Sequence, residues 1–224
     1  MLDENAVLNI IRKSDRQSFF ERKYVMATVA QKKLDKKVRL LQSAYALFES
    51  KGVSMTAVDD VVKAAGVAKG TFYLYFKDKH DLIDQMMIAQ SRSALHEILD
   101  ELQKKRETEA LSPADRLIFV FDRIFAHLLK HWKLAPLICK NLSACCRANC
   151  ESSDRETQED MNRLLDPFFE VGMDETDARI HLFLLGDMLG GLCCEAILGE
   201  SPYDLNRIRP CVVSIITKCI KKEG

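Results

Sequence analysis

The feature that most constrains the fold is a helical spacing of apolar residues that runs through nearly the whole chain. The stretches LDKKVRLLQSAYALFESKG (34–52) and HDLIDQMMIAQSRSALHEILDELQKK (80–105) place apolar residues at intervals of three and four. Glycine and proline, which interrupt helices, number only 9 and 5 among 224 residues. A single β-strand would have no partner in such a chain, so we expect an all-α protein.

Residues that favour helix ends divide the chain into segments. Thr56 can cap TAVDDVVKAAG, Asp78 can cap the long helix after it, and Ser112 precedes a proline that opens another helix. Ser201 precedes the last helix in the same way. Beyond residue 105 these signals and the apolar spacing predict helices at about 113–131, 135–149, 155–171, 176–198 and 203–221.

The stretch VAKGTFYLYFKDK (67–79) fits a strand by strict alternation, but its helical neighbours favour a helix that begins near Ala68. At about 100° per residue, Phe72 and Phe76 then share a buried face with Ala68, and Tyr73 points outward. Gly70 in the first turn weakens such a helix by roughly 1 kcal/mol relative to alanine, which suggests a close approach to a partner surface.

Two short helices joined by a glycine-containing turn form a helix-turn-helix, whose second helix enters the DNA major groove. In this context MTAVDDVVKAAGVAKGTFYLYFKDKHDLIDQMM (55–87), preceded by LLQSAYALFESKGVS (40–54), resembles the tetracycline-repressor (TetR) family. The resemblance covers roughly 50 residues in register. It implies a three-helix DNA-binding head on a helical domain that dimerises and binds an effector.

The resemblance also implies which residues touch DNA. By this resemblance, residues at the start of the recognition helix contact base edges or nearby phosphates. The two tyrosines of that helix and the lysine that opens the next helix match positions that contact phosphates. One further residue matches a helix-capping position near a phosphate. The predicted DNA-binding residues are therefore Thr56, Lys69, Gly70, Thr71, Tyr73, Tyr75 and Lys79. Many members have Ser or Thr where this chain has Ala68, so one cap or phosphate contact is expected to be missing.

The resemblance divides the chain into three segments. Residues 34–79 form the predicted helix-turn-helix domain, and residues 80–224 form a helical effector-binding and dimerisation domain. Residues 1–33 are an N-terminal extension that we expect to be helical from Ser18 onward. Lys32, Lys33, Lys36 and Lys37 fit either a DNA-gripping arm or a solvated helix face.

The charge distribution agrees with a nucleic-acid partner for the first third. Residues 1–80 hold 15 Lys and Arg against 9 Asp and Glu, whereas residues 81–224 hold 18 against 24, so the net charge of zero hides a balance of +6 and −6. The chain has no run of about 18 apolar residues and no secretory leader pattern at its start, which predicts a cytoplasmic protein without a membrane segment.

The cysteine and histidine residues fit more than one role. The 8 cysteines include Cys146 and Cys150, four residues apart, but no CxxC pair; they fit buried thiols or a redox or soft-metal sensor. His127 and His131 have metal-ligand spacing but lack the glutamate of HExxH, so packing or exposed histidines are favoured. No motif of nucleophilic, phosphate-binding or dinucleotide chemistry occurs. We expect no enzyme, no metal and no cofactor.

These observations predict a transcriptional regulator. We expect a repressor that binds double-stranded DNA at a pseudo-palindromic operator, dimerises through its last two helices and is released by a small, mostly apolar effector. A thiol-redox or soft-metal sensor on the same scaffold is the alternative. Seven aromatic residues fit either an effector cavity or an ordinary core: Phe119, Phe121, Phe125, Trp132, Phe168, Phe169 and Phe183.

Overall fold

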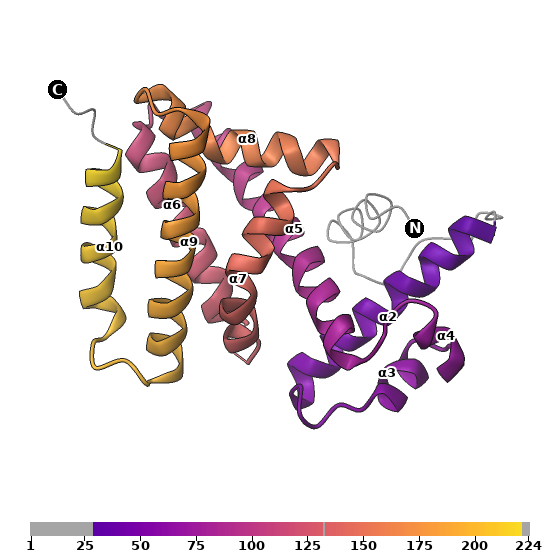
Figure 1. The fold of residues 1–224 in the computed structure, drawn as a ribbon. Coiled ribbons are helices and arrows are strands. Elements are labelled where there is room, and N and C mark those ends of the chain that lie inside the picture. Colours follow the sequence, from indigo (N-terminus) through magenta and orange to yellow (C-terminus); the bar gives the residue numbers. More distant parts are fainter. Residues whose placement is uncertain (1–28, 132, 221–224) are drawn as a thin grey trace. The chain divides into compact units, whose positions relative to one another are not determined.

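A computed structural model describes residues 29–131 and 133–220 of the chain. Every regular element in these ranges is an α-helix, which confirms the predicted fold class (Figure 1). The helices are α2 (Val29–Lys51), α3 (Val58–Ala64), α4 (Lys69–Tyr73), α5 (Lys79–Arg106), α6 (Pro113–Lys130), α7 (Ala135–Cys150), α8 (Arg155–Glu170), α9 (Glu175–Leu198) and α10 (Leu205–Cys219).

Several helices begin as their capping residues predict. The Ser112 hydroxyl accepts the Asp115 N–H before α6, with Pro113 in the first position, and Asp78 accepts the Asp81 N–H before α5. That bond is also the main reason why the pKa of Asp78 lies below its usual value.

Two predicted caps are wrong. The N-cap of α3 is Ala57, one residue after Thr56, and the N-cap of α10 is Asp204, three residues after Ser201. At α3 the Asp60 carboxylate accepts the Ala57 N–H at 2.9 Å, so a carboxylate in the first turn replaces the hydroxyl cap that Thr56 would have supplied. At α10 the Asp204 carboxylate accepts the Arg207 N–H at 2.9 Å.

The N-terminal compact unit extends through Ser93, so the first half of α5 belongs to it together with α2, α3 and α4. Its core joins apolar residues that recur at helical spacing on each of these helices. The buried set comprises Val38, Leu40, Leu41, Ala44, Phe48, Val61, Val62, Ala65, Phe72, Phe76, Leu82, Ile83, Met86, Met87 and Ala89. The predicted helix over residues 18–33 falls mainly on residues 1–28, outside the described residues.

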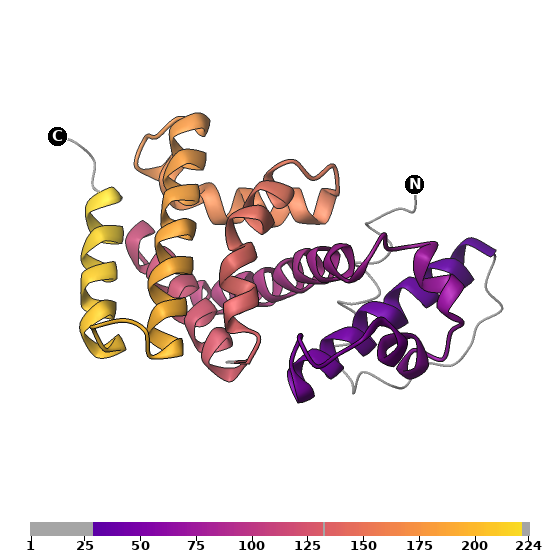
Figure 2. The ribbon, with the colours of Figure 1, turned by 60° about the horizontal axis from the view of Figure 1, so that its bottom comes forward.

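The C-terminal compact unit begins at Ala94 and contains the end of α5 with α6 to α10. Figures 1 and 2 both show α9 and α10 running side by side. One apolar cluster takes residues from α5, α6, α8, α9 and α10, including Leu99, Phe121, Phe168 and Val212. Phe119 and Phe125 pack against that cluster, so these aromatic residues contribute to the core. The Phe169 side chain is partly exposed.

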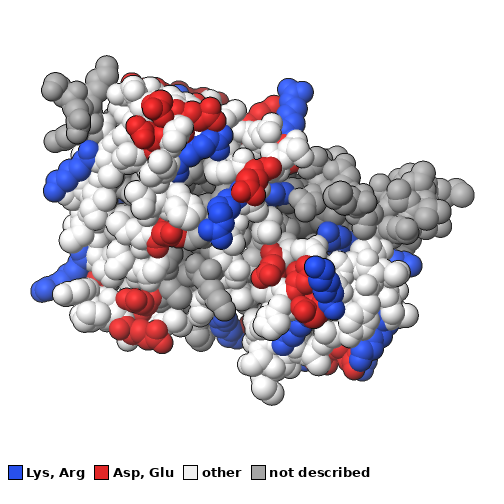
Figure 3. Space-filling model, in the orientation of Figure 1, with Lys and Arg blue, Asp and Glu red and all other residues white. Residues whose placement is uncertain are grey.

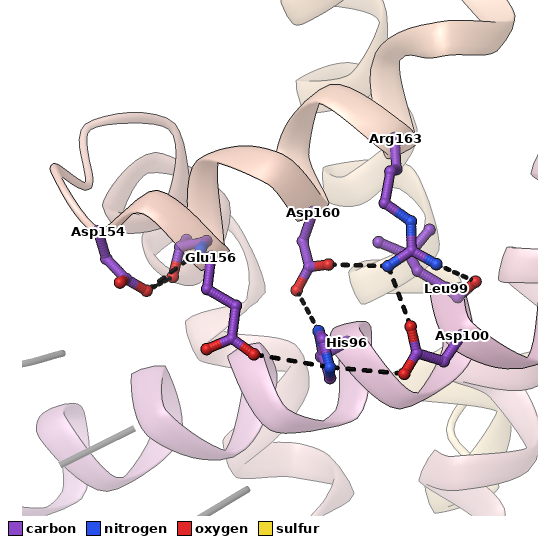
Figure 4. A network of polar contacts seen from close by, with 8 residues as sticks. His96, Leu99, Asp100, Asp154, Glu156, Asp160 and Arg163 are labelled. Carbon is purple, nitrogen blue, oxygen red and sulfur yellow. Dashed lines mark hydrogen bonds and ion pairs between the residues drawn. The ribbon is translucent and has the colours of Figure 1, made fainter. Parts of the chain in front are cut away.

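A polar network joins α5 to α8 within this unit (Figure 4). His96 Nδ1 lies 2.9 Å from Asp160 Oδ2, and His96 Nε2 lies 3.5 Å from Asp100 and 3.6 Å from Glu156. Arg163 bridges the Asp100 and Asp160 carboxylates at 3.1 Å each and also donates to the Leu99 carbonyl. Because Asp160 is almost fully buried, its charge depends on these partners.

The network predicts a large difference between two arginines of α8. Arg163→Ala removes the bonds to Asp100, Asp160 and the Leu99 carbonyl, and it leaves a buried carboxylate with fewer donors. We expect it to lower the free energy of unfolding by about 1–3 kcal/mol. Arg155→Ala, which removes an exposed i,i+4 pair with Glu159, should change it by less than about 0.5 kcal/mol. Urea unfolding followed by circular dichroism measures both; equal effects would contradict the assigned role of the network.

Candidate nucleic-acid interface

The helix-turn-helix is built by α3, a short turn and α4. Gly66 ends α3 with φ at +64°, a left-handed conformation that glycine adopts without strain. The Val67 N–H then donates to the Val62 carbonyl at 3.0 Å, which closes the end of α3. Ala68 is the N-cap of α4 and supplies no side-chain hydrogen bond, as the departure from the TetR pattern predicts.

Burial of two phenylalanines fixes the orientation of α4. Phe72 and Phe76 are fully buried, and the Phe76 N–H donates to the Phe72 carbonyl at 3.0 Å. Tyr73 and Leu74 are exposed, by 56% and 77%. The helix is shorter than predicted because it ends at Tyr73. Phe72 and Phe76 are buried and Tyr73 is exposed, as predicted. The prediction that Ala68 shares the buried face is wrong, because Ala68 is the exposed N-cap that precedes the first turn.

Lys69, the first residue of α4, makes an ion pair with Asp59 on α3. Lys69 Nζ lies 2.7 Å from Asp59 Oδ1, and more than half of each side chain is exposed. The hydrogen bond from this ammonium to Asp59 raises the pKa of Lys69. The pair spans the turn and presents one cation and one anion side by side on the exposed surface.

Gly70 and Thr71 follow Lys69 in α4. Gly70 is exposed, its φ is not in the left-handed region, and a Cβ at this position would have no neighbour within 4 Å. The packing of the described residues therefore does not require a glycine here. Thr71 is half-buried, and its N–H donates to the Ala68 carbonyl at 2.8 Å.

The two predicted phosphate-binding tyrosines differ in exposure. Tyr73 packs edge-on against Phe72 with ring centroids 5.2 Å apart. Tyr75 is half-buried beside Phe76, and burial raises the pKa of its phenol, which therefore remains a hydrogen-bond donor at neutral pH.

Thr56 and Lys79 have internal roles that the sequence did not predict. The buried Thr56 hydroxyl donates to the Gly52 carbonyl at 2.8 Å, so it holds the loop between α2 and α3. Lys79 Nζ donates to the Val53 carbonyl of the same loop and lies 5.9 Å from the Phe48 ring centroid. Lys79 has two ammonium hydrogens left for another acceptor, whereas the Thr56 side chain is not available at the surface.

The exposed surface also contains features that the sequence reasoning missed. Asp59 is one of them: it has no predicted role, although an acidic residue before the turn and a basic residue after it are a signal for a pair across the turn. Figure 3 shows acidic and basic side chains interspersed on the visible face. Among the residues that the structure describes, no group of three His, Cys, Asp or Glu side chains could hold a metal ion.

The family model described as "Bacterial regulatory proteins, tetR family" matches residues 40–86, which contain α3, the turn and α4. Residues 40–86 therefore have the helix-turn-helix of the TetR family. The N-terminal unit of the chain contains this DNA-binding domain, and a helical C-terminal unit follows it.

Relatives agree with this assignment. The chain is 36% identical over 91 residues to the HTH-type transcriptional regulator AcrR of Shigella flexneri, and the match covers 41% of this chain and 39% of that protein. It is 21% identical over 201 residues to the fatty acid metabolism regulator protein of Bacillus subtilis, covering 84% and 97%. The match spans 28–39% of the length of the first four curated relatives.

Solved structures support the fold. A TetR transcriptional regulator from Rhodococcus sp. RHA1 superposes with a TM-score of 0.56 at 19% identity, covering 86% of this chain and all of that one. AlkX from Dietzia sp. gives a TM-score of 0.55 at 16% identity, covering 82% and 95%. Within the described part of this chain, no helix is both long and apolar enough to cross a membrane.

The open space around Gly70 gives a testable prediction. Gly70→Ala should leave the fold intact and raise helix stability by up to about 1 kcal/mol, because no described residue contacts the added methyl group. The same methyl group should weaken DNA binding if the backbone at Gly70 approaches the DNA.

Gly66→Ala is the matched control, since its left-handed backbone should make that variant less stable. Thermal unfolding and a fluorescence anisotropy titration with duplex DNA measure the two quantities. A Gly70→Ala protein with unchanged DNA affinity would contradict a close approach there.

Proposed function

We propose that this chain is a transcriptional regulator that binds duplex DNA through α4 and acts as a repressor in the cytoplasm. The observation that carries the proposal is the exposed face formed by Lys69, Gly70 and Tyr73 on a helix that is anchored by buried Phe72 and Phe76. Residues 29–80 also hold 10 Lys and Arg against 5 Asp and Glu, a surplus suited to a polyanion.

Each predicted contact has a defined role in this proposal. Lys69 reads base edges. Gly70 allows the backbone of α4 to come close to the DNA, and Thr71 makes a contact there. Tyr73 and Tyr75 donate phenolic hydrogens to phosphates, and Lys79 adds a phosphate contact while it holds Val53. The buried Thr56 contributes through the position of its loop, because its hydroxyl is already bonded to Gly52.

We also propose that two copies of the chain pair through α9 and α10. Ile180 and Leu184 are exposed one turn apart on α9, and Ile215 is exposed on α10. Gly191 is exposed with open space around its Cβ position, which permits a close helix approach. Such a dimer would place two α4 helices on a pseudo-palindrome, with half-sites about 34–36 Å or more apart.

A pair of variants tests the DNA contacts. Lys69→Ala should relax the base preference at one operator position, because a base-edge contact carries sequence information. Tyr73→Phe keeps the ring against Phe72 but removes a phenol, so it should weaken binding to all DNA sequences alike by about threefold to tenfold.

Tyr203→Phe, an exposed tyrosine of the C-terminal unit, is the control and should bind as the parent does. Anisotropy titrations against specific and scrambled duplexes at several salt concentrations measure these effects, and affinity should fall as salt rises. Affinity that is insensitive to salt would reject the proposed phosphate contacts.

We further propose that a mostly apolar small molecule binds among the helices between residues 80 and 199 and lowers operator affinity. Fatty acids and their derivatives are the first candidates, because the match to the Bacillus subtilis fatty acid metabolism regulator spans nearly all of that protein. α5 is the element that carries a signal toward α4, since it is one continuous helix shared by both compact units.

The thiol-sensor alternative keeps one specific observation in its favour. Cys150 interacts with Arg179, and this contact, after the larger effect of Glu175, helps to raise the pKa of the Arg179 guanidinium. Cys150 is a free thiol and only partly buried, and thiols are the groups that oxidants and soft metals attack.

Ligand titration separates the two signals. Fatty acids and acyl thioesters of several chain lengths should reduce operator affinity by about 5- to 150-fold, and operator should reduce ligand affinity by the same factor. A ligand that binds tightly without changing operator affinity is rejected as the effector. Release of DNA by peroxide or a thiophilic metal, abolished in Cys150→Ser, would favour the thiol sensor.

A further inference from the structure

The ion pair between Asp59 and Lys69 suggests more than a structural role. It joins α3 to the first residue of α4, and both side chains remain more than half exposed, by 67% and 56%. The neighbouring acidic residue, Asp60, is occupied by Lys51 and by the Ala57 N–H. Asp59 is therefore the carboxylate that accompanies the proposed base-reading lysine, and a role for this pair in reading DNA rests on that proposed function.

The spacing of the pair matches the polar edge of a guanine–cytosine base pair. The donor and acceptor of the protein pair, Lys69 Nζ and Asp59 Oδ1, are 2.7 Å apart. In the major groove, the guanine O6 acceptor and the cytosine N4 donor are held together by one hydrogen bond, at about 2.9 Å. A parallel approach of the two pairs thus lets the ammonium donate to guanine O6 while the carboxylate accepts from cytosine N4.

The order of groups across the groove distinguishes the base pairs. A guanine–cytosine pair presents N7 and O6 acceptors next to each other, followed by the N4 donor. The Lys69 ammonium has two hydrogens beyond the one given to Asp59, so it can reach both acceptors.

An adenine–thymine pair fits less well. Its donor lies between two acceptors, and the thymine methyl group follows the second one. With Asp59 on the adenine N6 donor, the Lys69 ammonium can reach only one acceptor, either N7 on one side or thymine O4 on the other. The pair then makes two hydrogen bonds to adenine–thymine, against three to guanine–cytosine, where N7 and O6 lie next to each other.

We propose that Asp59 and Lys69 act as one unit that reads a guanine–cytosine pair in each operator half-site, with Asp59 as a specificity-determining residue. Asp59 limits the mobility of the lysine side chain, which would otherwise reach any nearby phosphate. Its negative charge also opposes phosphate oxygens, so the pair favours base edges over the backbone.

The test is a selection of binding sites from random-sequence duplex DNA by the full chain and its variants. The parent protein should select a pseudo-palindrome with a fixed guanine–cytosine pair in each half-site. Asp59→Ala should reduce the preference for that pair over thymine–adenine by about 5- to 150-fold, which is the usual discrimination of a good base contact. Lys69→Ala should reduce it similarly, and the double variant should lose little more than either single variant.

Asp84→Asn is the matched control. It removes one negative charge from an exposed position of α5 in the same compact unit and should keep the selected sequence. Both members of the pair are exposed, so the variants should keep their melting temperatures, which circular dichroism checks.

The outcomes separate this inference from the proposed function. If Asp59→Ala keeps the base preferences of the parent and binds every sequence more tightly, Asp59 only repels the DNA phosphates, and the inference is wrong. A selected palindrome without a fixed guanine–cytosine pair would also overturn it. A parent protein that selects no sequence at all would instead reject the proposed DNA-binding function.

Discussion

The burial of Phe72 and Phe76 is the interaction on which the DNA-binding surface depends. A five-residue helix has too few internal hydrogen bonds to be stable by itself, so α4 exists because Phe72 within it and Phe76 just after its end are fixed in a core. Burying each ring contributes roughly 2–3 kcal/mol, which exceeds the helix penalty of about 1 kcal/mol for Gly70. The chain can therefore keep a glycine where the surface needs one.

The same packing decides which side chains face outward. With Phe72 and Phe76 turned inward, Lys69 and Tyr73 remain exposed, and the turn at Gly66 brings Asp59 within reach of Lys69. The Thr56 hydroxyl and the Lys79 ammonium hold the loop between α2 and α3 by hydrogen bonds to its carbonyl groups. In the C-terminal unit a polar network joins two helices, because Arg163 and His96 bind the buried Asp160 carboxylate between α5 and α8.

The sequence predicts the helices well because apolar spacing and capping residues are local signals. The end of α2 at Lys51 before Gly52, and the beginning of α6 at Pro113, follow from such signals alone. The predicted caps at Thr56 and Ser201 are wrong because several residues near each helix start can accept a backbone hydrogen, and tertiary contacts choose among them. The Thr56 hydroxyl instead donates to the Gly52 carbonyl, a contact that helical periodicity cannot predict. The candidate site is only partly predictable for the same reason, since the outward face of α4 follows from its periodicity but the partners of Lys69 and Lys79 come from α3 and from the α2–α3 loop.

Hydrogen exchange of the full chain, with and without the duplex that it selects, tests the central claim most directly. If α4 enters the major groove, bound DNA should slow exchange of backbone amides between Val58 and Tyr73, with the largest change at Lys69, Gly70 and Thr71. Exchange at the α8 amides should change less. Protection confined to other segments, with unchanged exchange across α3 and α4, would contradict the account.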